Sequence, residues 1–582
     1  MKIYIYLLIF FILISCSEEI EIETSLPSTP EDLIQHTSEF QKEVIEVTDG
    51  VHMAIGFALA NAMMVEGEDS NIIIDTTGTV ETAREVKDIF QSINPNPIST
   101  IIYTHNHGDH VYGASVFAED SDPEIYAHSS TEKYISRVIG ILRPIISSRS
   151  GKMFGNVLPN EEVENNGIGP FLEIGKDGRT PGLLYPNKVF EDKLEFEVSG
   201  IKVVLYHAPG ETNDQLFVWL PDKKALFPGD NFYKTFPNLY TIRGTPYRDL
   251  AGWVNSIDMM RYLEPEHLIP SHTRPISGKE EIYKTLTTYR DGIQYVHDQT
   301  IRMMNLGMGP DEIAEKISLP KHLGDSPFLK EFYGSPEWSA RNVFSGYLGW
   351  FDGNPSTLKP LPRMEEANNI IGLAGGWEKL FSIAEESFKK EQYQWSLQLT
   401  DYLLLTKPNN KETNILRQSC LQALGERESN PNSRYFYLSS AALLDENYKQ
   451  NDLLAPTQES INKYPIEAML EILKVSVVPE KSIEKDIQLL FHFTDTGKKF
   501  SLFLRKGVLE IQPFEVAGSS VQVLAKEEDM KAVLTGLKSL PISLVTGSIK
   551  VNGSKSDLLS LFSSCLSEKD VCIIFLNTFY PG

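Results

Sequence analysis

Short apolar segments alternate with amphipathic ones over the first half of the chain. Residues 80–90 carry apolar side chains at helical spacing, which predicts a helix. The apolar segments before and after it are short and rich in β-branched residues, which is typical of buried strands. Alternation of this kind predicts a layered α/β or αββα core. The segments that we interpret as strands with the polar residues that follow them are 71–78, 99–110, 202–210, 224–230 and 267–273.

The pattern changes twice further along the chain. After about residue 280 the strand patterns end, and helical spacing interrupted by Gly and Pro continues to about residue 450. Two of these segments resemble a tetratricopeptide-type helical hairpin, but one or two such units cannot build a solenoid, so we expect a helical bundle for docking or dimerisation. From about 455 onward a helix, a hairpin turning at 495–497, and further strands and helices predict an α+β module.

Length and charge limit the possible classes of protein. A chain of 582 residues is too long for one core, so three or four domains are expected. The formal net charge of −25 and the absence of a basic stripe argue against a nucleic-acid partner. An acidic surface is explained more simply as a device for solubility.

The N-terminus has the features of a signal peptide. One early lysine precedes an apolar run over 3–14, too short to span a bilayer comfortably, and Ser15-Cys16 follows. LISC resembles the bacterial lipobox, which implies lipidation at Cys16 and, because Ser17 follows it, the outer membrane, facing the periplasm or the surface. The alternatives are a membrane-anchoring helix and a chance cysteine. Residues 17–45 are expected to form a flexible tether.

The other cysteines do not indicate a metal site or a disulfide framework. Cys420, Cys565 and Cys572 are few and scattered, and none has zinc-knuckle spacing. A bridge between Cys565 and Cys572 is possible in an oxidising compartment.

The sequence HNHGDH, residues 105–110, concentrates potential metal ligands at the end of a predicted strand. In an extended backbone His105 and His107 face the same way and can reach one metal. Gly108 then lets the chain turn, which would deliver Asp109 and His110 to a second position. Three imidazoles and a carboxylate pack poorly without a metal, so the block predicts a site for two metals.

Three later strands each end in one further potential ligand. These residues are Glu211, Asp230 and His272. Taken singly, each could equally cap a strand or form an ordinary hydrogen bond. Strands that converge in a layered core would bring the three side chains to the HNHGDH block.

The HNHGDH block followed by GET, GDN and SHT resembles the metallo-β-lactamase superfamily, whose αββα sandwich binds two zinc ions. Most members have a His where this chain has Glu211, and a Glu there resembles the alkylsulfatase, or type III sulfatase, branch. Segments 58–67, 238–244 and 346–355 are similar to the same branch, and the resemblance covers nearly everything past residue 45. It implies a signal peptide and tether followed by three domains: a catalytic domain at 46–285, a helical dimerisation domain at 286–450 and a sterol-carrier-protein-like α+β domain at 455–582.

The resemblance also implies a ligand set and a homodimer. One zinc would be held by His105, His107 and Glu211, the other by Asp109, His110 and His272, with Asp230 as the bridge. The family often has Glu in an AEN sequence where this chain has Asp230 in GDN, which leaves the exact subfamily and substrate open.

Two further residues match positions that contact sulfate in the family. These are Asn238 and Arg243, for which the plain alternatives are a turn residue and a surface ion pair. We interpret His207 as a strand-end or supporting histidine and Asp75 as support for the ligand loop.

The resulting expectation is a lipid-anchored hydrolase that cleaves sulfate from small amphiphilic alkyl sulfates through a metal-bound hydroxide. Asp109, Asp230 and Arg243 would be its catalytic residues. The alternatives are a hydrolase of a phosphoester, thioester or lactone on the same fold, and a non-catalytic surface lipoprotein that binds lipid. The sequence leaves open the chain length, primary or secondary esters, S–O or C–O cleavage, the general acid, and lipid binding by the C-terminal domain.

Overall fold

The computed structural model describes residues 28–139, 141–174, 179–445, 448, 462, 464–519 and 521–565. The predicted signal peptide, its Cys16 and the first part of the predicted tether lie outside these residues, as does Cys572. No helix of the described ranges is both long and apolar enough to cross a membrane.

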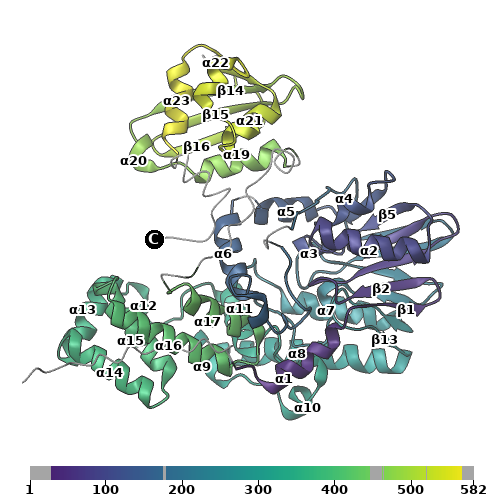
Figure 1. Cartoon of the computed structure of the whole chain (residues 1–582), viewed down its shortest axis with the longest axis horizontal. Helices are drawn as coiled ribbons and strands as arrows, with labels where there is room; N and C mark the ends of the chain where they lie inside the picture. Colours follow the sequence, from purple (N-terminus) through teal and green to yellow (C-terminus); the bar gives the residue numbers. More distant parts are fainter. Residues whose placement is uncertain are drawn as a thin grey trace, which may run out of the picture.

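Two sheets form the N-terminal half of the molecule (Figure 1). The first sheet is antiparallel at its start and parallel from β4 onward. Its strands, in spatial order, are β1 (Glu43–Thr48), β2 (Val51–Ile55), β3 (Ala62–Glu66), β4 (Asn71–Ile74), β5 (Ile98–Ile102), β6 (Glu124–His128) and β7 (Lys188–Phe190). The second has the order β13 (Ile276–Ser277), β12 (His267–Leu268), β11 (Ala225–Phe227), β10 (Leu216–Leu220), β9 (Ile201–His207) and β8 (Lys193–Val198).

The sheets pack face to face, and helices cover both outer faces. Apolar side chains of β2, β4, β9 and β10 fill the space between the sheets. The outer face of the first sheet packs against α2 (Val80–Ile93), α4 (Ala114–Phe117) and α5 (Thr131–Ile139). The outer face of the second packs against α7 (Leu250–Tyr262) and α8 (Lys279–Asn305). The predicted αββα sandwich is therefore confirmed.

Two predicted boundaries fall within folded elements of the structure. The tether was expected to run to residue 45, but α1 (Glu31–His36), the short 3₁₀ helix Thr37–Phe40 and β1 already belong to the folded body. His36 is buried and bonds to the carbonyl of Gly167 at 2.7 Å. The expected catalytic boundary at residue 285 falls inside α8, which is continuous and packs along α7.

A bundle of helices follows, as predicted. The helices α13 to α16 surround an apolar core of their own, which includes Leu380, Leu403 and Cys420. The helix α17 packs on α16 and contributes Ala441 to this core, and it also packs on α6 (Arg143–Met153) of the N-terminal half. The helices are α9 (Pro310–Lys316), α10 (Lys321–Gly324), α11 (Pro336–Leu348), α12 (Pro355–Leu358), α13 (Arg363–Ala374), α14 (Trp377–Lys389), α15 (Tyr393–Thr406), α16 (Lys411–Arg427) and α17 (Pro431–Ala442).

The C-terminal module is the predicted α+β unit, drawn yellow-green in Figure 1. Its hairpin turns where Asp495 to Gly497 predicted it, because Gly497 has a positive φ of 72°. One core packs its sheet against its helices. The strands, in spatial order, are β16 (Val508–Gln512), β15 (Lys499–Arg505), β14 (Asp486–Phe493), β17 (Val521–Ala525) and β18 (Ile549–Asn552), and the helices are α19 (Ile466–Val475), α20 (Pro479–Ser482), α21 (Glu527–Leu534), α22 (Leu540–Thr546) and α23 (Lys555–Ser563).

Candidate metal centre

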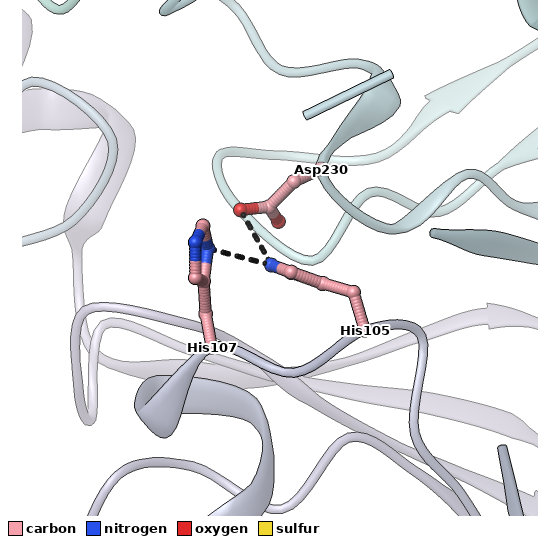
Figure 2. Close-up of side chains that lie close together, drawn as sticks. All are labelled: His105, His107 and Asp230. Atoms are coloured by element: carbon pink, nitrogen blue, oxygen red, sulfur yellow. Dashed lines mark hydrogen bonds and ion pairs between the residues drawn. The ribbon is translucent and has the colours of Figure 1, made fainter. Parts of the chain in front are cut away.

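Six of the predicted ligands meet at the carboxyl ends of the strands, in two groups. The first is His105, His107 and Asp230, and Figure 2 shows His107 and Asp230 both facing Nε2 of His105. The second is Asp109, His110 and His272. In each group one ligand atom per residue lies within 4.8 Å of the others, as a bound metal ion requires.

Asp230 lies between the two groups. Its Oδ2 is 3.5 Å from Nε2 of His105, and its Oδ1 is 3.2 Å from Nε2 of His272 and 3.5 Å from Nε2 of His110. One oxygen therefore faces each group, which is the arrangement expected of a bridging carboxylate.

The donor set fits divalent metal ions. Oδ1 of Asp230 and Nε2 of both His110 and His272 are buried without a well-aligned hydrogen-bond partner in the described part of the chain. Leaving a buried polar atom unpaired costs about 1 to 3 kcal/mol, so three of them converging on one space fit the binding of a cation there. Imidazole nitrogen and carboxylate oxygen are ligands that zinc accepts.

The outer nitrogens of the same rings are already bonded. Nδ1 of His110 lies 2.8 Å from Oδ2 of Asp75, and Nδ1 of His272 lies 2.8 Å from the carbonyl of Leu59. These contacts fix each ring and direct its Nε2 inward, as in metal sites generally.

Asp75 supports the ligand loop, as predicted. It is fully buried, and besides His110 it accepts hydrogen bonds from the Thr104 backbone N–H and hydroxyl, both at 2.9 Å, and from the Ser271 hydroxyl at 2.7 Å. One carboxylate thus joins the loops after β4, β5 and β12.

The charges of the centre are strongly coupled. Burial lowers the pKa of His105 to about 3 and also lowers the pKa of His107 well below its ordinary value. Burial opposes the charged form of His110 too, but Asp230, Asp109 and Asp75 together raise its pKa well above the ordinary value. A cation is therefore favoured where these carboxylates crowd together.

Gly108 is needed for space, which corrects the reason predicted for it. It begins the short helix α3 (Gly108–Val111) and does not have a positive φ. A Cβ there would stand 2.6 Å from Cε2 of Tyr112 and 2.9 Å from Cδ1 of Ile174. The turn itself is an ordinary helix start with His107 as the residue before it.

Glu211 lies beside the centre but outside both groups. Its Oε1 is 2.7 Å from Nη1 of Arg248, and its Oε2 accepts from the Tyr233 hydroxyl at 3.4 Å. Glu211 and Arg248 are both 2 % exposed. Burial, opposed by Arg248, raises the pKa of Glu211 to about 7.

The two predicted sulfate residues differ in their positions. Nη2 of Arg243 donates to Nε2 of His107 at 3.0 Å, and Arg243 lines a cavity of about 220 Å³. Asn238 is buried, its amide has no partner among the described residues, and it does not line that cavity. Its main-chain N–H donates a hydrogen bond to the Tyr233 hydroxyl at 2.8 Å. The structure thus brings Arg243, and not Asn238, to the cavity.

The cavity adjoins the first metal group, because His107 lines it. His107, Glu211, Arg243 and Arg248 line it on one side. Two helices also line it. The helix α5 contributes Tyr134, Arg137 and Val138, and α6 contributes Ile145, Ile146 and Arg149 together with its N-cap residue, Leu142. The sequence did not predict a role for Arg137, Arg149 or Arg248. For Arg248 the one available signal was its short distance in sequence from Arg243, and for the other two there was none.

His207 has no part in the metal groups. It ends β9, stacks on His128 with ring centroids 3.9 Å apart, and its Nε2 lies 2.8 Å from the carbonyl of Asn213. This agrees with the prediction of a strand-end histidine.

Three family models match successive parts of the chain. The model of the metallo-beta-lactamase superfamily matches residues 55–272, that of alkyl sulfatase dimerisation matches 309–447, and that of the alkyl sulfatase C-terminal domain matches 455–571.

Similar proteins of known name extend over nearly the whole chain. A linear primary-alkylsulfatase from Pseudomonas sp. (strain ATCC 19151) is 32 % identical over 88 % of this chain and 99 % of its own length. The alkyl/aryl-sulfatase BDS1 of Saccharomyces cerevisiae is 26 % identical over 89 % of this chain and 82 % of its own. The solved structure of the stereoselective inverting sec-alkylsulfatase Pisa1 from Pseudomonas sp. has the same fold, with a TM-score of 0.84 at 24 % identity over 90 % of this chain and 85 % of that one.

Proposed function

This chain belongs to the alkylsulfatase family, and we propose that it hydrolyses alkyl sulfate esters with two zinc ions held at the centre described above. His105, His107 and Asp230 would hold one ion, and Asp109, His110 and His272 the other, with Asp230 as the bridge. Glu211 would complete the first site, beside which it lies with its two oxygens bonded to Arg248 and to the Tyr233 hydroxyl. Bound zinc lowers the pKa of a coordinated water to about 7 and so supplies a hydroxide nucleophile at neutral pH.

The observation that carries the proposal is the position of Arg243. Its guanidinium lies 3.0 Å from a ring nitrogen of His107, a predicted ligand, and Arg243 and His107 line the same cavity. A planar guanidinium binds two oxygens of a sulfate at once. A sulfate ester bound by Arg243 would therefore have its sulfur next to the metals.

The cavity also fits an amphiphilic substrate. Val138, Leu142, Ile145 and Ile146 give the cavity an apolar wall, and its polar floor consists of His107, Glu211, Arg243 and Arg248. An alkyl chain packed on that wall would leave its sulfate on the floor and exclude water from the reacting group.

The test is release of inorganic sulfate from alkyl sulfates of graded length by the zinc-loaded protein. A phosphodiester, a thioester and a lactone are assayed beside them, and D109A serves as the inactive control. We expect sulfate release from medium-chain esters, with a loss of about 100-fold or more in D109A. Absence of sulfate release at every chain length, or faster turnover of another ester, would reject the proposal; turnover of none of them would favour the lipid-binding alternative.

We further propose that the protein is a homodimer through its helical region. Several large apolar side chains are exposed there, and the most exposed are Leu373 at 85 % and Trp350 at 75 %. Such side chains on a soluble protein indicate a contact surface. The match to an alkyl sulfatase dimerisation model over the same residues supports this assignment.

The cellular location proposed is the bacterial envelope, with a lipid anchor at Cys16. The support is the sequence of residues 1–16 alone. Metabolic labelling with a radioactive fatty acid tests it, because C16A should lose the label and leave the membrane fraction. Equal labelling of both forms would contradict the anchor.

A further inference from the structure

Two helices carry matching stripes of side chains into the cavity. On α5, Tyr134, Arg137 and Val138 are spaced i, i+3 and i+4, so they share one face. The residues on α6 are also spaced along one face: after the N-cap residue Leu142 come Ile145, Ile146 and Arg149, at i+3, i+4 and i+7. Each stripe is apolar except for a single arginine.

The wall they form stands against the loop that carries Arg243. A Cβ built on Gly244 would lie 3.4 Å from Cδ1 of Ile146, so this loop packs directly on α6. Arg149 follows Ile146 by one helical turn. The cavity therefore has arginines on two sides, with Arg243 and Arg248 at the metal groups and Arg137 and Arg149 on the helices.

Arg137 and Arg149 have no protein partner in the described part of the chain. No carboxylate of the described residues lies within ion-pair distance of either, although acidic residues outnumber basic ones in the sequence by 79 to 54. Several arginines elsewhere in the described part of the chain pair with carboxylates, as seen for Arg84, Arg261, Arg274, Arg290, Arg341, Arg417, Arg427 and Arg505, whereas others, such as Arg143 and Arg302, do not. Two guanidinium groups without a carboxylate partner among the described residues therefore line the same cavity.

The helices that carry these two arginines are anchored at several points. The Tyr134 hydroxyl accepts a hydrogen bond from Nδ2 of Asn213 at 3.2 Å, which ties α5 to the loop of Glu211. The helix α6 packs along α17, and the Ser439 hydroxyl donates to the carbonyl of Lys152 at 3.3 Å. The guanidinium groups therefore project from fixed elements, as a binding site requires.

We propose that Arg137 and Arg149 form a second anion-binding site, so that the preferred substrate is a sulfate ester whose tail carries another anionic group. The proposal rests on the function proposed above and narrows its substrate class. A purely aliphatic tail lying on this wall would take water from two guanidinium groups and return no acceptor. A carboxylate, phosphate or second sulfate on the tail would accept charge-assisted hydrogen bonds from them.

The test is calorimetric binding of two unreactive ligands to the zinc-loaded full chain. Octane-1-sulfonate carries one anion, and 8-carboxyoctane-1-sulfonate carries a second at the far end of the tail. We expect the dianion to bind about 10-fold more tightly. R137Q, R149Q and the double variant should reduce this ratio, the double variant to about one. R143Q is the matched control, because Arg143 also lies on α6 without an ion pair in the described residues but does not line the cavity.

Several results would overturn the second site. The first is equal affinity of the native protein for the two ligands. The second is equal weakening of both ligands in R137Q and R149Q, which would show a general attraction of anions. The third is a loss of the affinity ratio in R143Q as large as that in R137Q or R149Q. Failure of either ligand to bind at all would also overturn it. If the double variant does not fold, the two single variants give the same comparison. Because sulfonates are not hydrolysed, a preserved binding ratio with no sulfatase activity would sink the proposed function and leave the second site standing.

Discussion

At the scale of single residues, Asp75 connects more of the centre than any predicted ligand does. Its carboxylate accepts four hydrogen bonds from three residues: Thr104 and His110 of the segment after β5, and Ser271 of the loop after β12. It also has a φ of 56°, a region that Asp and Asn tolerate better than other side chains.

D75N keeps this backbone conformation and removes the charge. We expect zinc affinity to fall about 10- to 100-fold, because the amide cannot accept from all these donors. Competition with a chromophoric chelator measures the change. S271A removes one donor only and should lose much less; equal losses in the two variants would contradict a central position for Asp75.

Variants of Arg243 should weaken substrate binding and leave zinc binding unchanged. R243A should lower kcat/KM for an alkyl sulfate about 100-fold, and R243K about 10-fold, because lysine keeps the charge without the planar fork. Both variants should retain the native zinc content, as measured by atomic emission. Loss of zinc in R243K would show that the residue is structural.

The ligand block was readable from the sequence because its members are adjacent. His105 to His110 form one uninterrupted segment, and a strand pattern precedes them. Arg248 was not readable, because its contact with Glu211 depends on how two loops fold together. The position of Asn238 away from the cavity likewise follows from tertiary packing.

At the scale of elements, alternation of apolar and polar residues predicted most strands and helices correctly. The failure at residues 31–45 has a physical cause. The segment is polar, and long-range contacts such as His36 with Gly167 and Ser429 with Asp32 order it. No local pattern reports contacts of that kind.

The two glycines that flank α3 should respond differently to alanine. A Cβ at Gly113 would stand 1.8 Å from the carbonyl oxygen of Thr76, which is backbone and cannot move away easily. At Gly108 the close atoms belong to the side chains of Tyr112 and Ile174. We expect G108A to cost about 1 to 3 kcal/mol of unfolding free energy, and G113A to cost more or to prevent folding.

Denaturant unfolding of both variants measures the difference. G108A/I174A should recover part of the loss of G108A, because the double variant relieves the contact. A larger loss in G108A than in G113A would contradict this account of α3.

At the scale of the whole molecule, the stability should depend on pH through Glu173. Burial raises the pKa of this carboxyl from 4.5 to about 7, although the backbone N–H groups of Leu59 and Gly78 donate to it. The folded state therefore keeps a proton that the unfolded chain releases above pH 4.5. The free energy of unfolding should fall by about 3 kcal/mol from this group as pH rises from about 4.5 to 7.

Chemical denaturation of the chelator-treated protein between pH 5 and 8 tests this dependence. E173Q cannot ionise and should have a flatter profile, while E85Q, on the exposed surface, should keep the native one. If the free energy of unfolding of E173Q depended on pH as steeply as that of the native protein, Glu173 would not be the cause of the dependence.

Assembly should respond to one exposed leucine. L373E places a charge in the proposed dimer surface and should shift the protein toward a monomer in sedimentation velocity. V545E changes an equally exposed residue of the C-terminal module, 88 % exposed, and should leave the dimer intact. A monomeric native protein would contradict the dimer.

The most direct test of the central claim is titration of the metal-free protein with zinc while sulfate release from a medium-chain alkyl sulfate is recorded. The two ligand groups joined by Asp230 predict activity that reaches its maximum at two zinc ions per chain. A maximum at one ion per chain, or no sulfate release at any zinc concentration, would contradict a two-metal alkyl sulfate hydrolase.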